Sequence, residues 1–540
     1  MELGAGGNST EATDSMKIIR HGWTFLFALL TGASMLHAQE VKSVQQRTAN
    51  GVLEGVVSAD GKVRAFKGIP FAAPPVGPLR WKPPQPPAPW TGVRKAVEFG
   101  PHCMQGRIYD DMIFHDAGPS EDCLYLNLWL PANPPPGKLP VMVWIHGGGF
   151  AAGASSEPRQ DGGNLSKLGV LVVSLNYRLG ILGFFVHPEL TKESGHNASG
   201  NYGLLDQVAA LEWVKKNIAT FGGDPDNVTI FGESAGSMSV SALVASPLAK
   251  GLFHRAIGES GACWGNHVSK SREEAESAGV KFAESAFGTS SLEALRAKSA
   301  QEILDASLKP HTERSWPDVD GYFMPEDCNS IYAAGKQSRV PLLAGWNKDE
   351  GSYKAFFDKE PPTLDNYVAR AKVLFGNNAD AFLKVYSAKT DAEAKRAAQD
   401  YEGDQFIAFS TWKWLDMQLK TGKSKVFRYE FDQTLPLAAG VAPGTEPTAP
   451  HASDIEFVFR VLSSRDLPWR PEDQQVSELM AAYWTNFAKT GDPNGANLPH
   501  WPAYDSQNHY QVMHLTPKPA PAPDSHRDRY EFLERLGPLK

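Results

Sequence analysis

The sequence VTIFGESAGSMSV, residues 228–240, decides the fold that this chain can adopt. Its first four residues are β-branched or aromatic and are typical of a short buried strand, while the small and apolar residues at its end suit a helix. Between them, Gly232-Glu233-Ser234-Ala235-Gly236 fits the pattern G-x-S-x-G. In that pattern the glycines let strand and helix pack closely around a strained, exposed serine, which makes Ser234 a candidate nucleophile. Such a pentapeptide also arises by chance, so the rest of the chain must supply the partners.

A glycine-rich segment upstream offers groups that can stabilise negative charge. The apolar, strand-like run at residues 139–145 is followed directly by His146-Gly147-Gly148-Gly149-Phe150. Successive glycines let backbone N–H groups converge on one point, as the oxyanion of a tetrahedral intermediate requires. We therefore expect the N–H groups of Gly148, Gly149 and Ala235 to form an oxyanion hole. For the glycine segment taken alone, a tight turn that binds nothing is the alternative.

A serine hydroxyl is a weak nucleophile near neutral pH, so it needs a histidine base and a carboxylate that fixes the tautomer of that histidine. In the α/β-hydrolase order, the acid and then the histidine follow the serine. Asp349 and Glu350 come just after the apolar run at residues 340–345, and both satisfy the chemistry. His451 lies in a loop rich in Pro, Gly and Thr, which is a typical position for a functional side chain. Other downstream histidines keep the choice of base open, including His500, His509 and His514.

Strand-like and helix-like patterns alternate along most of the chain, and residues 70–90 are too rich in proline for regular structure. This alternation predicts an α/β fold with a central, mostly parallel sheet, flanking helices and large helical insertions over the active site. The expected elements are a β-hairpin at 48–68, strands at 139–145, 170–175, 228–231, 340–343 and 425–431, a helix at 206–220, and helix-rich segments at 273–308 and 364–403.

Composition and the N-terminal residues indicate where the chain works. A net charge of −8 lacks the basic excess that nucleic acid binding favours, so nucleic acid is not an expected partner. We interpret residues 1–38 as a leader with a secretory signal peptide, starting at Met16, with a short apolar run at 23–30 and cleavage after Ala38. That run is shorter than the ~20 residues that span a bilayer. Residues 39–540 would then form a single catalytic domain that is secreted or periplasmic.

Export makes the four cysteines candidates for disulfide bonds. Cys103 and Cys123 would close a short loop. Cys263 and Cys328 are paired only by elimination, and two reduced, buried thiols are the alternative.

Several further motifs occur in order along the chain. They are GIPFA at 68–72, PPVG at 74–77, SEDCLYLN at 120–127, HGGGF at 146–150, NYRLG at 176–180, GGDP at 222–225, the GESAG pentapeptide, NKDEGS at 347–352, DIEFVF at 454–459 and WTNF at 484–487. Over nearly all of its length after the leader, the chain thus resembles the type-B carboxylesterase family, which includes cholinesterases and fungal lipases. Chance does not produce so many motifs in order.

The resemblance implies a serine carboxylesterase on the α/β-hydrolase fold that hydrolyses small-molecule carboxylic esters through an acyl-enzyme. It implies a triad of Ser234, Glu350 and His451, with Glu233 as a carboxylate that tunes the site. It also pairs Cys123 with Cys103, whereas the other two cysteines do not follow the family's usual short second loop. We expect no metal or organic cofactor, since H-E-x-x-H and C-x-x-C patterns are absent from the sequence. A carboxylesterase or lipase of another substrate, amide or carbamate hydrolysis, and a non-catalytic binding module on the same fold are the alternatives.

Aromatic and basic residues elsewhere in the chain are candidates for the substrate pocket. Candidates for site-tuning residues or pocket walls are His146, Phe150, Trp264 and Trp346, although each would also suit a protein core. Candidates for binding an anionic acyl group are Arg159, Arg314, Lys348 and Lys354, with solvated surface charge as the alternative. Nothing in the sequence indicates an oligomeric state.

Overall fold

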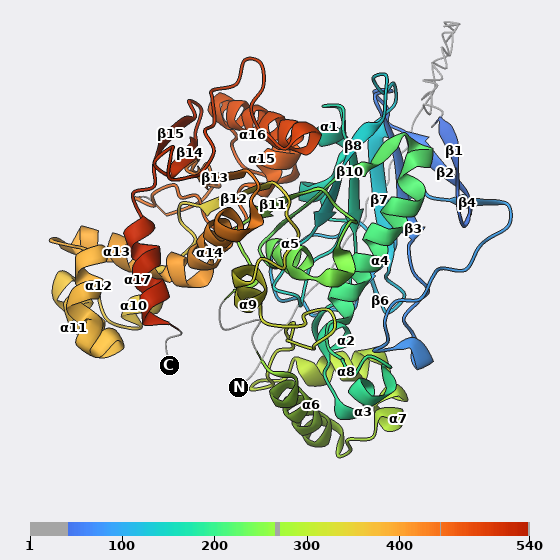
Figure 1. The fold of residues 1–540 in the computed structure, drawn as a ribbon, viewed down its shortest axis with the longest axis horizontal. Helices are drawn as coiled ribbons and strands as arrows, with labels where there is room; N and C mark the ends of the chain where they lie inside the picture. The colour runs from blue at the N-terminus through green and yellow to red at the C-terminus, as the bar shows by residue number, and fades with distance from the viewer. Residues whose placement is uncertain (1–41, 265–269, 443, 538–540) are drawn as a thin grey trace, which may run out of the picture. The chain divides into compact units, whose positions relative to one another are not determined.

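A mostly parallel β-sheet forms the centre of the fold (Figure 1). The structure, a computed structural model, describes residues 42–264, 270–442 and 444–537. The expected signal peptide and its cleavage site lie outside the described residues. Within those residues, no helix combines the length and the apolar character that crossing a membrane requires.

The sheet runs in the order β1-β2-β3-β7-β9-β8-β10-β11-β12-β13-β14-β15, with β4 beside β2. Along this order, pairing is parallel from β9 through β14 and antiparallel on either side, while β4 pairs with β2 in parallel. The prediction of an α/β fold with a mostly parallel sheet is therefore confirmed. The strands are β1 (Ser43–Thr48), β2 (Gly51–Val57), β3 (Val63–Pro70), β4 (Val93–Lys95), β7 (Tyr125–Pro131), β8 (Leu139–Ile145), β9 (Leu171–Leu175), β10 (Gly223–Glu233), β11 (Arg255–Glu259), β12 (Leu342–Asn347), β13 (Val426–Phe431), β14 (Gln511–Leu515) and β15 (Ala520–Pro523), with a separate pair β5 (His102–Cys103) and β6 (Pro119–Ser120).

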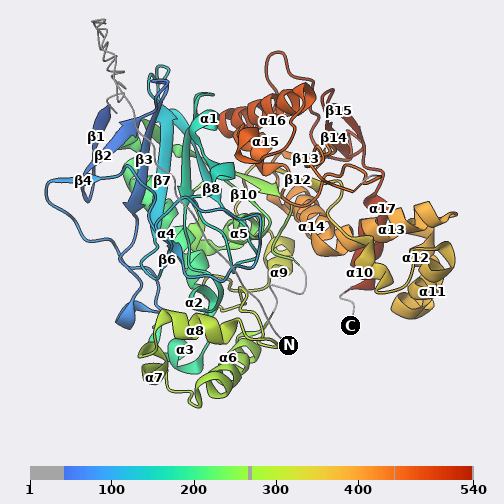
Figure 2. The same cartoon turned by 180° about the vertical axis from the view of Figure 1, so that it is seen from behind.

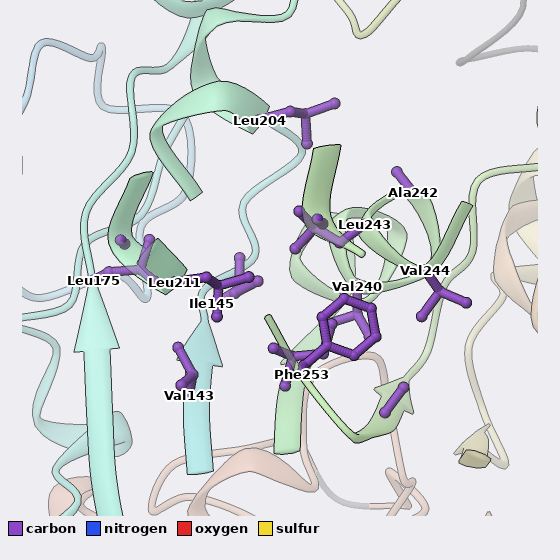
Figure 3. Packing of buried hydrophobic residues seen from close by; sticks show 14 of the residues in the cluster. Val143, Ile145, Leu175, Leu204, Leu211, Val240, Ala242, Leu243, Val244 and Phe253 are labelled. Carbon is purple, nitrogen blue, oxygen red and sulfur yellow. The ribbon is translucent and has the colours of Figure 1, made fainter. Parts of the chain in front are cut away.

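The sheet lies between two hydrophobic cores because successive side chains of a strand point to opposite faces. In β8, Val141, Val143 and Ile145 belong to one core, while Met142 and Trp144 belong to the other. Helices α4 (Tyr202–Asn217) and α5 (Ala235–Ala245) contribute to the first core, part of which Figure 3 shows. Helices α15 (Ile455–Phe459) and α16 (Pro471–Thr490) contribute to the second. Burial on both faces explains why the central strands read as nearly continuous apolar runs.

Two helical insertions leave the sheet after β11 and β12, and they occupy separate regions in Figure 1 and Figure 2. The first contains α6 (Arg272–Phe287), α7 (Leu292–Arg296), α8 (Ala300–Ser307) and α9 (Cys328–Ala333), and the second contains α10 (Tyr353–Phe357), α11 (Leu364–Phe375), α12 (Ala379–Val385), α13 (Asp391–Gly403) and α14 (Phe409–Met417). The remaining helices are α1 (Gly163–Ser166), α2 (Gly180–Phe184), α3 (Pro188–Glu193) and α17 (Arg527–Leu536). Both insertions start where parallel strands end, which is the edge at which open α/β sheets bind ligands.

The expected hairpin at 48–68 corresponds to β2 and β3, and most element boundaries differ from the predictions by a few residues. Three of the differences are the largest or concern the site. The helix expected at 206–220 begins at Tyr202, the strand of the GESAG segment begins at Gly223, and β12 extends to Asn347. The last difference matters for the site, because the ladder with β13 continues through Trp346 and Asn347 and makes both of them strand residues.

Candidate active site

Ser234 stands at a sharp turn between β10 and α5, with φ 55° and ψ −122°. A non-glycine residue adopts this backbone region only where the surroundings enforce it. The flanking glycines are required by close packing. A Cβ atom on Gly236 would lie 2.0 Å from the carbonyl oxygen of Ile145, and one on Gly232 would lie 2.5 Å from the same atom. The segment thus has the geometry expected of a G-x-S-x-G elbow.

His451 is held by Glu350. The imidazole Nδ1 lies 2.6 Å from Glu350 Oε2, and the other carboxylate oxygen accepts hydrogen bonds from Ser260 Oγ at 2.6 Å and from the Asn347 N–H at 2.8 Å. The Glu350 side chain is only 2% exposed, whereas that of His451 is 26% exposed. A buried, fully hydrogen-bonded carboxylate on Nδ1 fixes the tautomer that leaves Nε2 free to accept a proton.

Asp349, the other acid left open by spacing, has a different position. Its Oδ2 accepts a hydrogen bond from the Ala449 N–H at 2.9 Å, its own N–H donates to the Ala449 carbonyl at 3.0 Å, and its Oδ1 lies 2.6 Å from Arg396 Nη1. These bonds join the loop of Glu350 to the loop of His451. Asp349 therefore holds the acid and the imidazole in register without touching the ring.

The imidazole lies between two carboxylates, because its Nε2 is 3.2 Å from Glu233 Oε1. Burial opposes the charged form of His451, but Glu233 and Glu350 outweigh it and raise the pKa of the imidazole to about 9. Burial raises the pKa of Glu233 to about 8, although the attraction of His451 works against the rise. Within the described residues, Ser234 Oγ and His451 form no hydrogen bond, and in enzymes this contact often tightens only once substrate is bound.

A deeper layer of carboxyl groups lies beneath these residues. Asp454 accepts hydrogen bonds from Tyr429 Oη at 2.9 Å and Asn347 Nδ2 at 3.3 Å, and Glu259 accepts one from Trp484 Nε1 at 2.7 Å. Burial raises the pKa of Asp454 to about 6 and that of Glu259 well above its ordinary value. Both groups therefore retain protons at a higher pH than ordinary carboxyls do, and the Asp454 carboxylate, once ionised, contributes to the raised pKa of His451.

The glycine loop after β8 presents free N–H groups next to the serine. Its carbonyl oxygens accept hydrogen bonds from Tyr177 Oη (His146 O, 2.9 Å), His146 Nδ1 (Gly147 O, 2.9 Å), Ala152 N (Gly148 O, 3.0 Å) and Arg314 Nη2 (Gly149 O, 2.5 Å). By contrast, the N–H groups of Gly148 and Gly149 donate to no other described residue. Ala235 is the first residue of α5, so its N–H has no acceptor within the helix. A Cβ atom on Gly147 would lie 3.0 Å from the Ser234 Cβ, which shows how close the loop is.

The other candidates from the sequence divide between the loop and the core. His146 is buried, stacks on Tyr177, and has a pKa lowered to about 4 by burial, so it supports the loop as a neutral ring. Phe150 is buried against Phe184 and Trp316.

Two tryptophans fit the core alternative that the sequence left open. Trp264 packs on Tyr332. Trp346 lies between Tyr530 and the guanidinium of Arg428.

Only one of the four basic candidates contacts the loop. Arg159 pairs with Glu157, and Lys348 lies 3.7 Å from Asp432. Lys354 is exposed. Arg314 alone donates to the carbonyls of the glycine loop.

A cavity of about 1030 Å³ lies beside the first insertion and is lined by α6, Phe184, Arg314 and Trp316. Its lining includes none of Ser234, Glu350 and His451. Arg314 joins the lining of this cavity to the carbonyls of the glycine loop.

Sequence reasoning missed Ser260 and the role of Asn347, and it named Arg314 only as a candidate for binding an anionic acyl group, without its contact to the glycine loop. A signal for Ser260 exists, because Gly258-Glu259-Ser260-Gly261 repeats the first residues of the GESAG segment at the end of the neighbouring strand β11. Ser260 also shares the positive φ of Ser234, at 55°. Asn347 acts through its backbone N–H, which every residue except proline has, and Arg314 lies on an insertion that is distant in sequence from the loop. Neither contact therefore produces a local sequence pattern.

Both cysteine pairs form disulfide bonds, Cys103 with Cys123 and Cys263 with Cys328. The second bond joins the segment that follows β11 to the first residue of α9 and resolves the alternative of reduced thiols. Of the other histidines, His514 pairs with Asp432 at 2.7 Å. With Glu430, these two form the one described group whose ligand atoms lie close enough to share a metal ion, and the Lys348 ammonium already lies near Asp432.

Comparisons with known proteins agree with this geometry. The model of the carboxylesterase family matches residues 42–533. The chain is 37% identical to a fumonisin B1 esterase from Sphingopyxis macrogoltabida, over 89% of this chain and 88% of the relative. It is 38% identical to a medium-chain fatty acyl-CoA hydrolase precursor from Anas platyrhynchos (92% and 94% covered) and 36% identical to a human cocaine esterase (95% and 94% covered). The chain therefore belongs to the carboxylesterase family, adopts the α/β-hydrolase fold, and is a carboxylic ester hydrolase that acts on small-molecule esters.

Proposed function

We propose that Ser234, His451 and Glu350 form the catalytic triad of this esterase, and that the N–H groups of Gly148, Gly149 and Ala235 form its oxyanion hole. The observation that carries the proposal is the 2.6 Å contact between Glu350 and His451 Nδ1, made beside the strained serine of the elbow. The free N–H groups of the glycine loop support it further.

In this mechanism Ser234 Oγ attacks the ester carbonyl carbon while His451 Nε2 accepts the hydroxyl proton. The carbonyl oxygen becomes an oxyanion, and the three backbone N–H groups stabilise its charge. When the intermediate collapses, the C–O bond to the alcohol breaks and His451 returns the proton to the leaving oxygen. Water, deprotonated by the same imidazole, then attacks the acyl-enzyme and releases the carboxylic acid.

Replacement Ser234→Ala tests the nucleophile. We expect kcat to fall by at least about 10³-fold, since removal of a triad nucleophile leaves only the contributions of binding and the oxyanion hole. Ser285→Ala is the matched control, because that serine lies on an exposed part of α6 and only bonds its own helix. Turnover at the control rate would refute the nucleophile. Such a result would also favour the alternative that the chain is a non-catalytic binding module and that a contaminating enzyme hydrolyses the ester.

For the substrate, we propose esters of tricarballylic acid, with release of that acid from fumonisin as the reaction. The proposal rests on the resemblance to the fumonisin B1 esterase at 37% identity. The test compares kcat/KM for release of tricarballylate from fumonisin with that for release of acetate from an aryl ester. Faster hydrolysis of the aryl ester would refute this substrate and leave the triad untouched.

We also propose that residues 39–540 work as a single secreted or periplasmic domain. Two disulfide bonds support an oxidising compartment, and one family model covers residues 42–533. N-terminal sequencing of the mature protein tests cleavage after Ala38. An intact leader on protein recovered from the cytoplasm would refute export.

A further inference from the structure

Arg314, on the first insertion, reaches the carbonyl side of the glycine loop. Its Nη2 donates to the carbonyl oxygen of Gly149 at 2.5 Å and to that of Gly148 at 3.3 Å. The chain separation of 165 residues makes this a contact that only the tertiary fold creates. A side chain at position 149 would exclude it, because a Cβ atom there would lie 2.6 Å from Arg314 Nη2.

The guanidinium has few other partners. Among the described residues, it forms no ion pair with a carboxylate, and its Nε is buried without a hydrogen-bond acceptor. It lies 4.8 Å from the ring centroid of Trp316, which is 6.0 Å from Phe150, the residue after the loop. The loop carbonyls are therefore the polar groups that compensate the partial desolvation of this cation.

The contact matters because both carbonyls belong to peptide units of the loop. The shorter bond, at 2.5 Å, is made to the Gly149 carbonyl, which belongs to the peptide unit after Gly149, and anchors the guanidinium there. The Gly148 carbonyl, which Arg314 Nη2 contacts at 3.3 Å, and the Gly149 N–H are two ends of the preceding planar peptide unit. A charged donor on the carbonyl polarises that unit and makes its N–H a stronger donor, as in other chains of hydrogen bonds. The same bonds add to the backbone hydrogen bonds that the Gly148 carbonyl accepts from Ala151 and Ala152, and so help to restrain two glycines whose φ values are 98° and 57°.

We propose that Arg314 is a positioning residue for the oxyanion hole: it holds the Gly148–Gly149 peptide in place and polarises it, so that its N–H binds the developing oxyanion more strongly. This inference rests on the proposed function of the loop. Negative charge on the carbonyl oxygen of the substrate is greatest in the transition state, so the benefit of Arg314 should be greatest there and small in the Michaelis complex.

The test compares Arg314→Met and Arg314→Lys with the control Lys309→Met. Lys309 is an exposed cation on the same insertion and lines the same cavity. Its replacement by methionine removes an equal charge from a residue that makes no contact with the glycine loop within the described part of the chain. For each protein, an organophosphonate titration counts the active sites, and kcat and KM are then measured with an aryl ester. Two affinities are measured as well. Affinity for a trifluoromethyl ketone, which forms an oxyanion adduct with serine, reports on the transition state, and affinity for the product acid reports on the ground state.

We expect Arg314→Met to lower kcat per active site by about 10-fold, less than the roughly 10²–10³-fold that complete loss of an oxyanion donor costs. KM and product affinity should change less than twofold, and affinity for the ketone should fall in proportion to kcat. Arg314→Lys should recover part of the loss, and it serves as the measured variant if the methionine protein does not fold.

Three results would overturn the inference: an unchanged kcat in both variants, a rise in KM alone, or an unchanged affinity for the ketone despite a lower kcat. A rise in KM alone would mean that Arg314 binds substrate. Failure of the proposed function is distinguishable, because then the wild-type protein itself would form no adduct with the ketone at Ser234.

Discussion

The position of His451 between two carboxylates makes the pH dependence of the reaction sensitive to Glu233. His451 must be neutral to accept the serine proton, so kcat/KM rises with pH through the pKa of the imidazole. The two carboxylates raise that pKa from its ordinary 6.5 to about 9. Replacement Glu233→Gln removes one negative charge from beside Nε2 and should move the acid limb of the profile to lower pH.

The size of the shift follows from the geometry. At the 3.2 Å separation of His451 Nε2 and Glu233 Oε1, Coulomb's law with an effective dielectric constant of about 20 gives about 5 kcal/mol of attraction. Burial cancels part of this, and an opposite charge at such a distance typically shifts a pKa by about 1–3 units. We therefore expect the midpoint to fall by about 1–3 pH units. Burial raises the pKa of Glu233 to about 8, so Glu233 and His451 of the wild-type protein lose their protons in two coupled steps. In Glu233→Gln only His451 titrates, and the acid limb should show a single step.

The assay is kcat/KM for a neutral aryl ester between pH 5 and 10, normalised to titrated active sites. Glu326→Gln is the matched control, since it removes an exposed carboxylate that pairs with Lys336. An acid limb that stays within about 0.3 units of wild type, or that moves to higher pH, would refute the electrostatic reasoning.

Three further predictions concern the groups around the triad. Glu350→Gln should lower kcat by about 10³–10⁴-fold, because the amide no longer fixes the tautomer of His451; steady-state kinetics with a loss under tenfold would contradict its role. Asp349→Asn should lower kcat by only about 10-fold or less, since Asp349 holds the loop of Ala449 and not the ring; a loss equal to that of Glu350→Gln would show that the acid is misassigned. Removing the Cys263–Cys328 bond by a double serine substitution should lower the free energy of unfolding by about 4 kcal/mol, as expected for its separation of 65 residues. Denaturant unfolding measures this, and no change in midpoint would contradict it.

The elbow and the glycine loop could be predicted from sequence because each rests on a local backbone requirement. Only glycine permits the close approach of β10 and α5 to Ile145, so Gly232 and Gly236 in the sequence already indicate the tight turn. The strand β8 was predicted with its observed bounds, since a strand buried on both faces reads as an uninterrupted apolar run. Termini of other elements were less accurate, because ladder pairing extends β12 past the apolar run.

The remainder of the site depends on contacts between distant segments. Asp349 and Glu350 are adjacent and chemically alike, so spacing cannot distinguish the acid from the residue that clamps the loop; only the resemblance to the family favoured Glu350. Trp346 lies on β12 and packs against Tyr530 and Arg428, two residues from distant parts of the chain, so its surroundings could not be predicted from its neighbours in sequence. The contact of Arg314 with Gly149 likewise has no sequence signature.

The most direct test of the central claim is covalent labelling with an aryl organophosphonate, followed by peptide mass spectrometry. The account predicts one adduct per protein molecule, on Ser234, with labelling and esterase activity lost in parallel as pH falls. Ser234→Ala should take up no label while keeping the far-UV circular dichroism of the native fold. An adduct on any other residue, or full ester hydrolysis by a protein that takes up no label, would contradict the assignment of Ser234 as the nucleophile.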